Sequence, residues 1–139
     1  VRLARMQNGD LAMTTLLSGG CLCGHITFIA TNPGASHSCS CDLCQKHTGA
    51  QSVIWLEFAK GDVQWNGEGG KPAVWRSSED SSRAFCPRCG SSLGAIDDGP
   101  IIALLSGVFD QNQDARFAPA SHSFEDMKPQ WWRALFADA

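Results

Sequence analysis

The sequence predicts a small, mainly β domain with few short helices. Glycine is frequent, at 14 of 139 residues, and it separates short segments rather than long ones. Those segments are rich in β-branched and aromatic residues, which favour strands. Apolar residues make up 43% of the chain, enough for one core in a chain whose length fits one domain.

The expected strands follow one another along the chain. The first is 25–30 (HITFIA), and 52–58 and 63–65 flank a Lys-Gly-Asp turn that favours a hairpin between them. Four more are expected at 73–76, 83–85, 92–96 and 101–105, with a turn at 97–100 and a short piece at 107–109. The one expected helix is a single turn at 42–47, ended by Gly49.

Residues 1–17 are expected to be a flexible leader, and residues 18–139 a single domain. The leader holds Arg2 and Arg5 but no apolar block of the kind found in a secretion signal, which predicts a cytoplasmic protein. The net charge of −3 and the lack of a Lys/Arg run argue against nucleic-acid binding. Apolar runs such as 101–105 are too short to cross a membrane.

Seven cysteines are present, an odd number in a chain expected to occupy a reducing compartment, so disulfides do not explain them. Four form two close pairs, Cys21 with Cys23 in CLCG and Cys86 with Cys89 in CPRCG. Two such pairs supply the four tetrahedral ligands of a structural zinc ion. The alternative is a thioredoxin-like dithiol in CPRC, but the glycine- and serine-rich residues that follow form helices poorly.

The remaining cysteines, Cys39, Cys41 and Cys44, lie within six residues. Three thiolates can hold a zinc ion and leave its fourth position open, as in catalytic zinc sites. His37 and His47 flank the group, and either could instead close the site and make it a second structural zinc. Spacing alone leaves both interpretations open.

Three segments in this order resemble the glutathione-dependent formaldehyde-activating enzymes, a family that includes centromere-protein-V-like members. They are GGCLCGHITF (19–28), CSCDLC with a following TGA (39–50), and FCPRCGSSLG (85–94). The resemblance covers about residues 18–132. It implies a Mss4-like β-tent of antiparallel sheets held together by zinc. It also implies two zinc ions per chain, one structural on Cys21, Cys23, Cys86 and Cys89 and one catalytic on Cys39, Cys41 and Cys44.

The activity implied by the resemblance is that of a zinc-dependent carbon–sulfur lyase that joins glutathione to formaldehyde, giving S-hydroxymethylglutathione. The tail is similar to the family's closing segment at Pro119, His122, Lys128, Pro129 and Trp131. Relatives often carry an arginine after the third clustered cysteine. Here 45–47 is Gln-Lys-His, and Lys46 could supply the positive charge.

The alternative function is a non-catalytic binding or scaffold domain of Mss4-like fold, held together by zinc. Apart from the cysteines, His47 and His122 are candidate proton shuttles. The polar stretch 77–82 is a candidate lid over the site, and Trp131 with Trp132 is expected to close the end of the domain.

Overall fold

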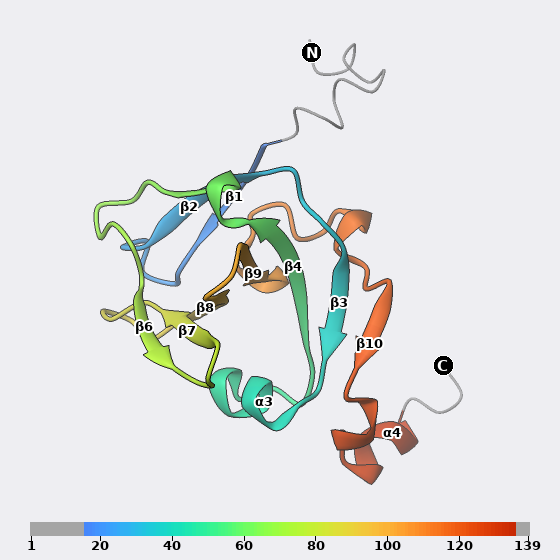
Figure 1. The fold of residues 1–139 in the computed structure, drawn as a ribbon. Helices are drawn as coiled ribbons and strands as arrows, with labels where there is room; N and C mark the ends of the chain where they lie inside the picture. The colour runs from blue at the N-terminus through green and yellow to red at the C-terminus, as the bar shows by residue number, and fades with distance from the viewer. Residues whose placement is uncertain (1–15, 136–139) are drawn as a thin grey trace, which may run out of the picture.

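The computed structural model describes residues 16–135, with the side chains of 16–133, and it contains two sheets. The smaller sheet has three antiparallel strands in the order β1-β2-β5: β1 (Leu16–Gly20), β2 (Thr27–Thr31) and β5 (Val63–Trp65). It packs against the larger sheet, with β1 and β2 drawn in blue (Figure 1).

The larger sheet has seven strands in the order β10-β3-β4-β9-β8-β7-β6. Neighbours are antiparallel except β10 and β3, which run parallel. The strands are β3 (Ser36–Cys39), β4 (Val53–Ala59), β6 (Ala73–Arg76), β7 (Ser81–Phe85), β8 (Ser92–Asp97), β9 (Ile101–Leu105) and β10 (Ser121–Ser123).

The helices are short. They are α3 (Asp42–Thr48), α4 (Gln130–Leu135) and the 3-10 helices Lys60–Asp62, Ser106–Val108, Ala115–Phe117 and Glu125–Met127. As predicted, the first helix ends at Gly49, whose φ of 80° suits a residue without a Cβ. None of the helices in residues 16–135 is long and apolar enough to span a membrane. The prediction of a mainly β fold with few short helices is confirmed.

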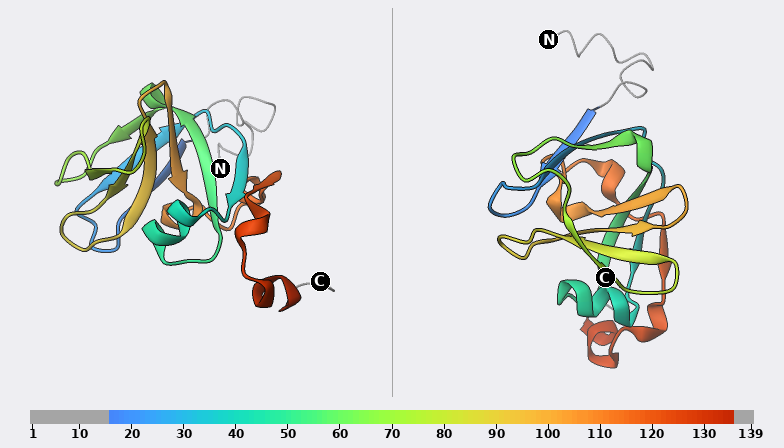
Figure 2. Two further views of the ribbon diagram at one scale, coloured as in Figure 1. Left: turned by 60° about the horizontal axis from the view of Figure 1, so that its bottom comes forward. Right: turned by 60° about the vertical axis from the view of Figure 1, so that its left-hand side comes forward.

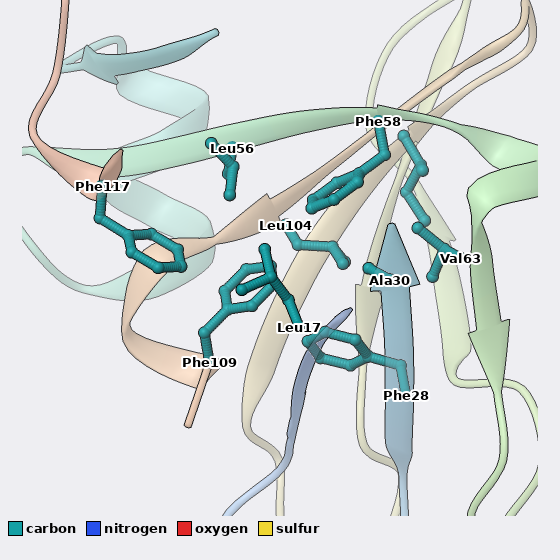
Figure 3. Close-up of a cluster of buried hydrophobic side chains, with 10 residues drawn as sticks. Leu17, Phe28, Ala30, Leu56, Phe58, Val63, Leu104, Phe109 and Phe117 are labelled. Carbon is teal, nitrogen blue, oxygen red and sulfur yellow. The ribbon is translucent and has the colours of Figure 1, made fainter. Parts of the chain in front are cut away.

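A cluster of phenylalanine rings fills the space between the two sheets (Figure 3). Phe109 stands at its centre, with ring centroids 5.1 Å from Phe28, 6.0 Å from Phe58 and 5.0 Å from Phe117. Leu17 of β1 points into the same cluster and is 1% exposed. Burying each such side chain stabilises the fold by roughly 1.5–3 kcal/mol, so this cluster is what holds one sheet on the other.

The predicted hairpin between 52–58 and 63–65 is wrong. β4 pairs with β3 and β9 in the larger sheet, whereas β5 pairs with β2 in the smaller one. The Lys-Gly-Asp segment is a 3-10 helix that carries the chain from one sheet to the other. Phe58 and Val63 both point into the core, so each strand finds its partners through burial rather than through the connecting turn.

Two further expectations need correction. The predicted leader overlaps β1 at Leu16 and Leu17, so the folded part begins before residue 18; residues 1–15 lie outside the described range. Trp131 does not close the end of the domain, because it is 56% exposed on α4, which projects from the sheets (Figure 2). Its ring packs edge-on against Trp132, with centroids 6.0 Å apart.

Candidate metal centres

The first cysteine cluster joins two turns that lie far apart in the sequence. The sulfur atoms of Cys21, Cys23, Cys86 and Cys89 all lie within 4.8 Å of one another. Cys23 Sγ is 3.7 Å from Cys21 Sγ and 3.8 Å from Cys86 Sγ. A tetrahedral zinc ion with Zn–S bonds of about 2.3 Å sets its sulfurs about 3.8 Å apart, so this cluster has the size of a zinc–tetrathiolate site.

The two turns of the first cluster are built alike. Each second cysteine is followed by a glycine, Gly24 or Gly90, at a φ of 81°, a conformation that other residues rarely adopt. Backbone N–H groups then donate to the sulfurs, from Ile26 to Cys21 (3.2 Å) and from Arg88 to Cys86 (3.3 Å). Such donors favour the charged thiolate and fix its direction toward the ion.

The position of this cluster also weighs against the redox alternative. Cys86 follows the last residue of β7, and residues 87–89 form a turn rather than the start of a helix. A thioredoxin-like thiol needs the positive end of a helix to lower its pKa. Here a hydrogen bond with the Ser91 hydroxyl lowers the pKa of Cys89 to about 5, which makes a ready thiolate ligand. The arrangement links the β1–β2 turn to the β7–β8 turn.

The second cluster lies where β3 meets α3. Cys39 ends the strand, Cys41 precedes the first helical residue, and Cys44 lies in the first turn, with all three sulfurs within 4.8 Å of one another. Cys41 Sγ accepts a hydrogen bond from the Cys44 N–H at 3.4 Å. Cys39 and Cys44 are 7% and 3% exposed. Local chain geometry therefore gathers the whole trio without help from a distant segment.

The thiols of the second cluster need a cation to ionise together. Burial, together with hydrogen bonding to the thiols of Cys44 and Cys41, raises the pKa of Cys39 to about 12. Several thiolates packed this closely repel one another, and a divalent ion offsets both that repulsion and the cost of burial. Three soft sulfur donors suit zinc, so these residues fit the predicted ion.

No histidine belongs to the second cluster among residues 16–133. His37 Nδ1 faces the Glu57 carboxylate at 3.6 Å. His47 Nε2 is buried and has no hydrogen-bond partner among the described residues. Burial, together with the positive charge of Arg83, lowers the pKa of His47 to about 4, so it is neutral at neutral pH. Among the described residues, the cluster therefore offers three protein ligands.

The other residues singled out from the sequence have defined places. His122 lies on β10, with its Nδ1 2.5 Å from the Ser38 hydroxyl. Lys128 forms an ion pair with Glu125 at 2.8 Å. The candidate lid is a tight turn between β6 and β7, fastened to the end of β8 by a two-pronged ion pair of Arg76 with Asp98, at 2.6 and 2.7 Å.

One residue beside the second cluster was missed from the sequence. Arg83, on β7, places Nη1 3.7 Å from Cys44 Sγ, and its guanidinium lies over the Trp55 ring, 5.5 Å from the centroid. Its Nε is buried without a hydrogen-bond partner among the described residues. Nothing local marks this arginine, because β7 approaches α3 only through the folding of the larger sheet. It puts a positive charge beside the second cluster.

Gln45, which follows the third cysteine of the trio, has a structural role. Its Nε2 donates to the Ser40 carbonyl at 2.7 Å and to the Met127 carbonyl at 3.3 Å. The side chain thus braces the loop between Cys39 and Cys41 and ties it to the C-terminal segment. It carries no charge for a ligand.

Comparisons with known proteins agree with this picture. The model of the family described as glutathione-dependent formaldehyde-activating enzyme matches residues 16–127, which include all seven cysteines. No curated protein matches the chain. The fold is similar to a crystal structure of a Rhodobacter sphaeroides protein from structural genomics, with a TM-score of 0.59 and 12% identity over 76% of this chain and 98% of that one. On the family match, the chain belongs to the glutathione-dependent formaldehyde-activating enzyme family.

Proposed function

We propose that this chain is a zinc-dependent carbon–sulfur lyase that forms and cleaves the adduct of glutathione with formaldehyde, S-hydroxymethylglutathione. One observation carries the proposal. The structure gathers the sulfurs of Cys39, Cys41 and Cys44 and adds no further His, Asp or Glu ligand from residues 16–133. A site with three protein ligands retains a position for a substrate, whereas a structural site is filled by four.

The reaction needs no oxidant. The glutathione sulfur forms a bond to the carbonyl carbon, the carbon–oxygen π pair moves to oxygen, and that oxygen takes up the proton that the thiol gives up. A zinc ion held by the trio would supply the positive charge that lowers the pKa of the reacting thiol and keeps it as a thiolate at neutral pH.

The chain's own residues would assist in two ways. Arg83 lies against Cys44 and adds a positive charge beside a cluster of thiolates, which reduces the cost of bringing up another anion. Burial of Cys39 and Cys44 keeps water away from two of the three sulfurs, so that this charge is weakly screened. In this proposal the other cluster, formed by Cys21, Cys23, Cys86 and Cys89, is a structural zinc site that stabilises the fold.

Zinc content and adduct formation test this proposal together. We expect two zinc ions per chain, one of them removed by a mild chelator and protected from it by glutathione. Exchange between ¹³C-formaldehyde and its glutathione adduct, followed by NMR, should exceed the spontaneous rate. Two equally inert ions with no acceleration would contradict the proposal and leave a non-catalytic scaffold as the function.

A further inference from the structure

A pocket of about 340 Å³ lies between α3 and the β6–β7 ribbon, beside the second cysteine cluster. Figure 2 (right) shows the helix below these strands. We name it the Trp75 pocket after its most exposed large apolar residue. Its lining residues include Leu43, Lys46 and His47 from α3, Trp75 from β6, and Arg83 and Phe85 from β7.

Arg83 connects this pocket to the proposed reaction site. Its side chain lines the pocket, and its Nη1 is 3.7 Å from Cys44 Sγ. A group bound in the pocket against Arg83 would therefore be separated from Cys44 Sγ by the Arg83 side chain. The pocket can therefore hold the non-reacting part of a substrate whose reactive carbon is at the cysteine cluster.

The walls combine apolar surface with positive charge. Trp75 is 72% exposed and Leu43 is 43% exposed, although both are large apolar side chains. Exposed apolar side chains gathered around a hollow are typical of a ligand site. Lys46 and Arg83 are cationic, and none of the described residues lining the pocket is acidic, although the chain as a whole carries a net charge of −3.

Neither expected substrate needs such a pocket. Formaldehyde has a single carbon and no apolar body, and glutathione is polar along its whole length. The low pKa of His47 leaves that wall uncharged at neutral pH, so the positive charge is confined to Lys46 and Arg83. The ligand that matches these walls has an aromatic or branched apolar body and a carboxylate.

We infer that the Trp75 pocket binds the body of a carboxylated, apolar aldehyde, and that such aldehydes are better substrates of this chain than formaldehyde. The inference rests on the proposed function and specifies its carbonyl substrate. The apolar body packs against Trp75, Leu43 and Phe85, and the carboxylate is held by Lys46 and Arg83. The aldehyde carbon then accepts the thiol sulfur at the cysteine cluster, with the same balance of bonds and protons as above.

Binding is tested first with three probes and the zinc-loaded protein, by isothermal titration calorimetry. Phenylacetate has both required features, acetate lacks the ring, and benzyl alcohol lacks the charge. We expect phenylacetate to bind more tightly than either of the others. Trp75→Ala should weaken it about tenfold, since it removes apolar contact area, and Lys46→Gln about threefold, since it removes a partly exposed ion pair.

Two matched variants serve as controls. Trp131→Ala removes another exposed tryptophan, and Lys60→Gln removes another lysine, both outside the pocket. Neither should change phenylacetate binding. Absence of binding, or equal binding to wild type and Trp75→Ala, would overturn the inference.

Turnover separates this inference from the proposed function. With glutathione as the thiol, adduct formation should be faster with 4-carboxybenzaldehyde than with benzaldehyde or formaldehyde. The ratio of the 4-carboxybenzaldehyde rate to the formaldehyde rate should fall in Trp75→Ala and stay unchanged in Trp131→Ala. Acceleration with formaldehyde alone would refute the aldehyde preference and leave the proposed function intact. Phenylacetate binding that depends on Trp75, without turnover of any aldehyde, would support the pocket assignment and refute the lyase.

Discussion

The two cysteine clusters are made of the same side chain but are assembled in opposite ways. The first takes two cysteines from each of two turns that lie far apart in the sequence. Cys23 in one turn and Cys86 in the other are separated by 63 positions. The second takes three residues from one strand–helix junction, Cys39 to Cys44. We expect an ion held by a cluster from distant turns to stabilise the fold, and an ion held by a locally assembled cluster to be removable while the sheets stay in place.

The strongest test of this difference is Cys86→Ser. The Cys86 side chain is fully buried and its sulfur accepts N–H groups from Arg88 and Cys89. Structural zinc contributes binding free energy directly to folding, so the variant should lose most of a stability of about 5–15 kcal/mol. We expect aggregation or loss of the cooperative transition in thermal unfolding followed by circular dichroism.

Cys41→Ser should have a large effect on chemistry and a small one on folding. It removes one of the three ligands of the second cluster, where the chain is already fixed by β3 pairing and by α3. We expect loss of one zinc per chain and of adduct formation by about a hundredfold or more, with a melting temperature close to that of wild type. If Cys41→Ser unfolds as fully as Cys86→Ser, the division into a structural and a catalytic cluster is wrong.

Arg83→Gln should have an intermediate effect. It keeps a polar side chain of similar length but removes the positive charge from beside Cys44. Loss of a residue that supports metal ligands typically costs about 10–100-fold. We expect glutathione to bind about tenfold more weakly and the second zinc to be stripped more readily by a chelator.

The matched control for that variant is Arg88→Gln. Arg88 lies beside the first cluster, where its Nη1 is 3.2 Å from His25 Nδ1. Glutathione affinity should be unchanged in this variant. Equal losses in both variants would show that overall charge, rather than the contact with Cys44, determines thiol binding.

The sequence predicted those parts of the fold that are determined by residues close together in the chain. The strands Val63–Trp65, Ala73–Arg76 and Ile101–Leu105 have the predicted bounds, and the cysteine grouping follows from spacing alone. β1, β3 and β10 were missed because LLSGG, SHSC and SHS are glycine-rich or polar. Their strand conformation comes from their partners in the sheets.

Gly19 shows why β1 could not be predicted. A Cβ at this position would lie 2.2 Å from the Val108 carbonyl oxygen, so the glycine is needed for close approach between chain segments rather than for a turn. Arg83, beside the second cluster, could not be predicted for a similar reason. Its contact with Cys44 joins residues 39 positions apart and exists only once β7 and α3 are in place. Long-range contacts of this kind have no local pattern.

The smallest predicted effect is on pH dependence and concerns His47. Its pKa is lowered from 6.5 to about 4 by burial and by Arg83, so between these values the unfolded chain binds more protons than the folded one. Stability should therefore fall as the pH is lowered from 6.5 toward 4, and this contribution should vanish above 6.5. His47→Gln should flatten the slope of unfolding free energy against pH, measured by urea denaturation from pH 7.5 to 5. Because acid also protonates zinc-bound thiolates in both proteins, the informative quantity is the difference between variant and wild type. An unchanged slope in His47→Gln would mean that this ring is not held neutral by its burial beside Arg83.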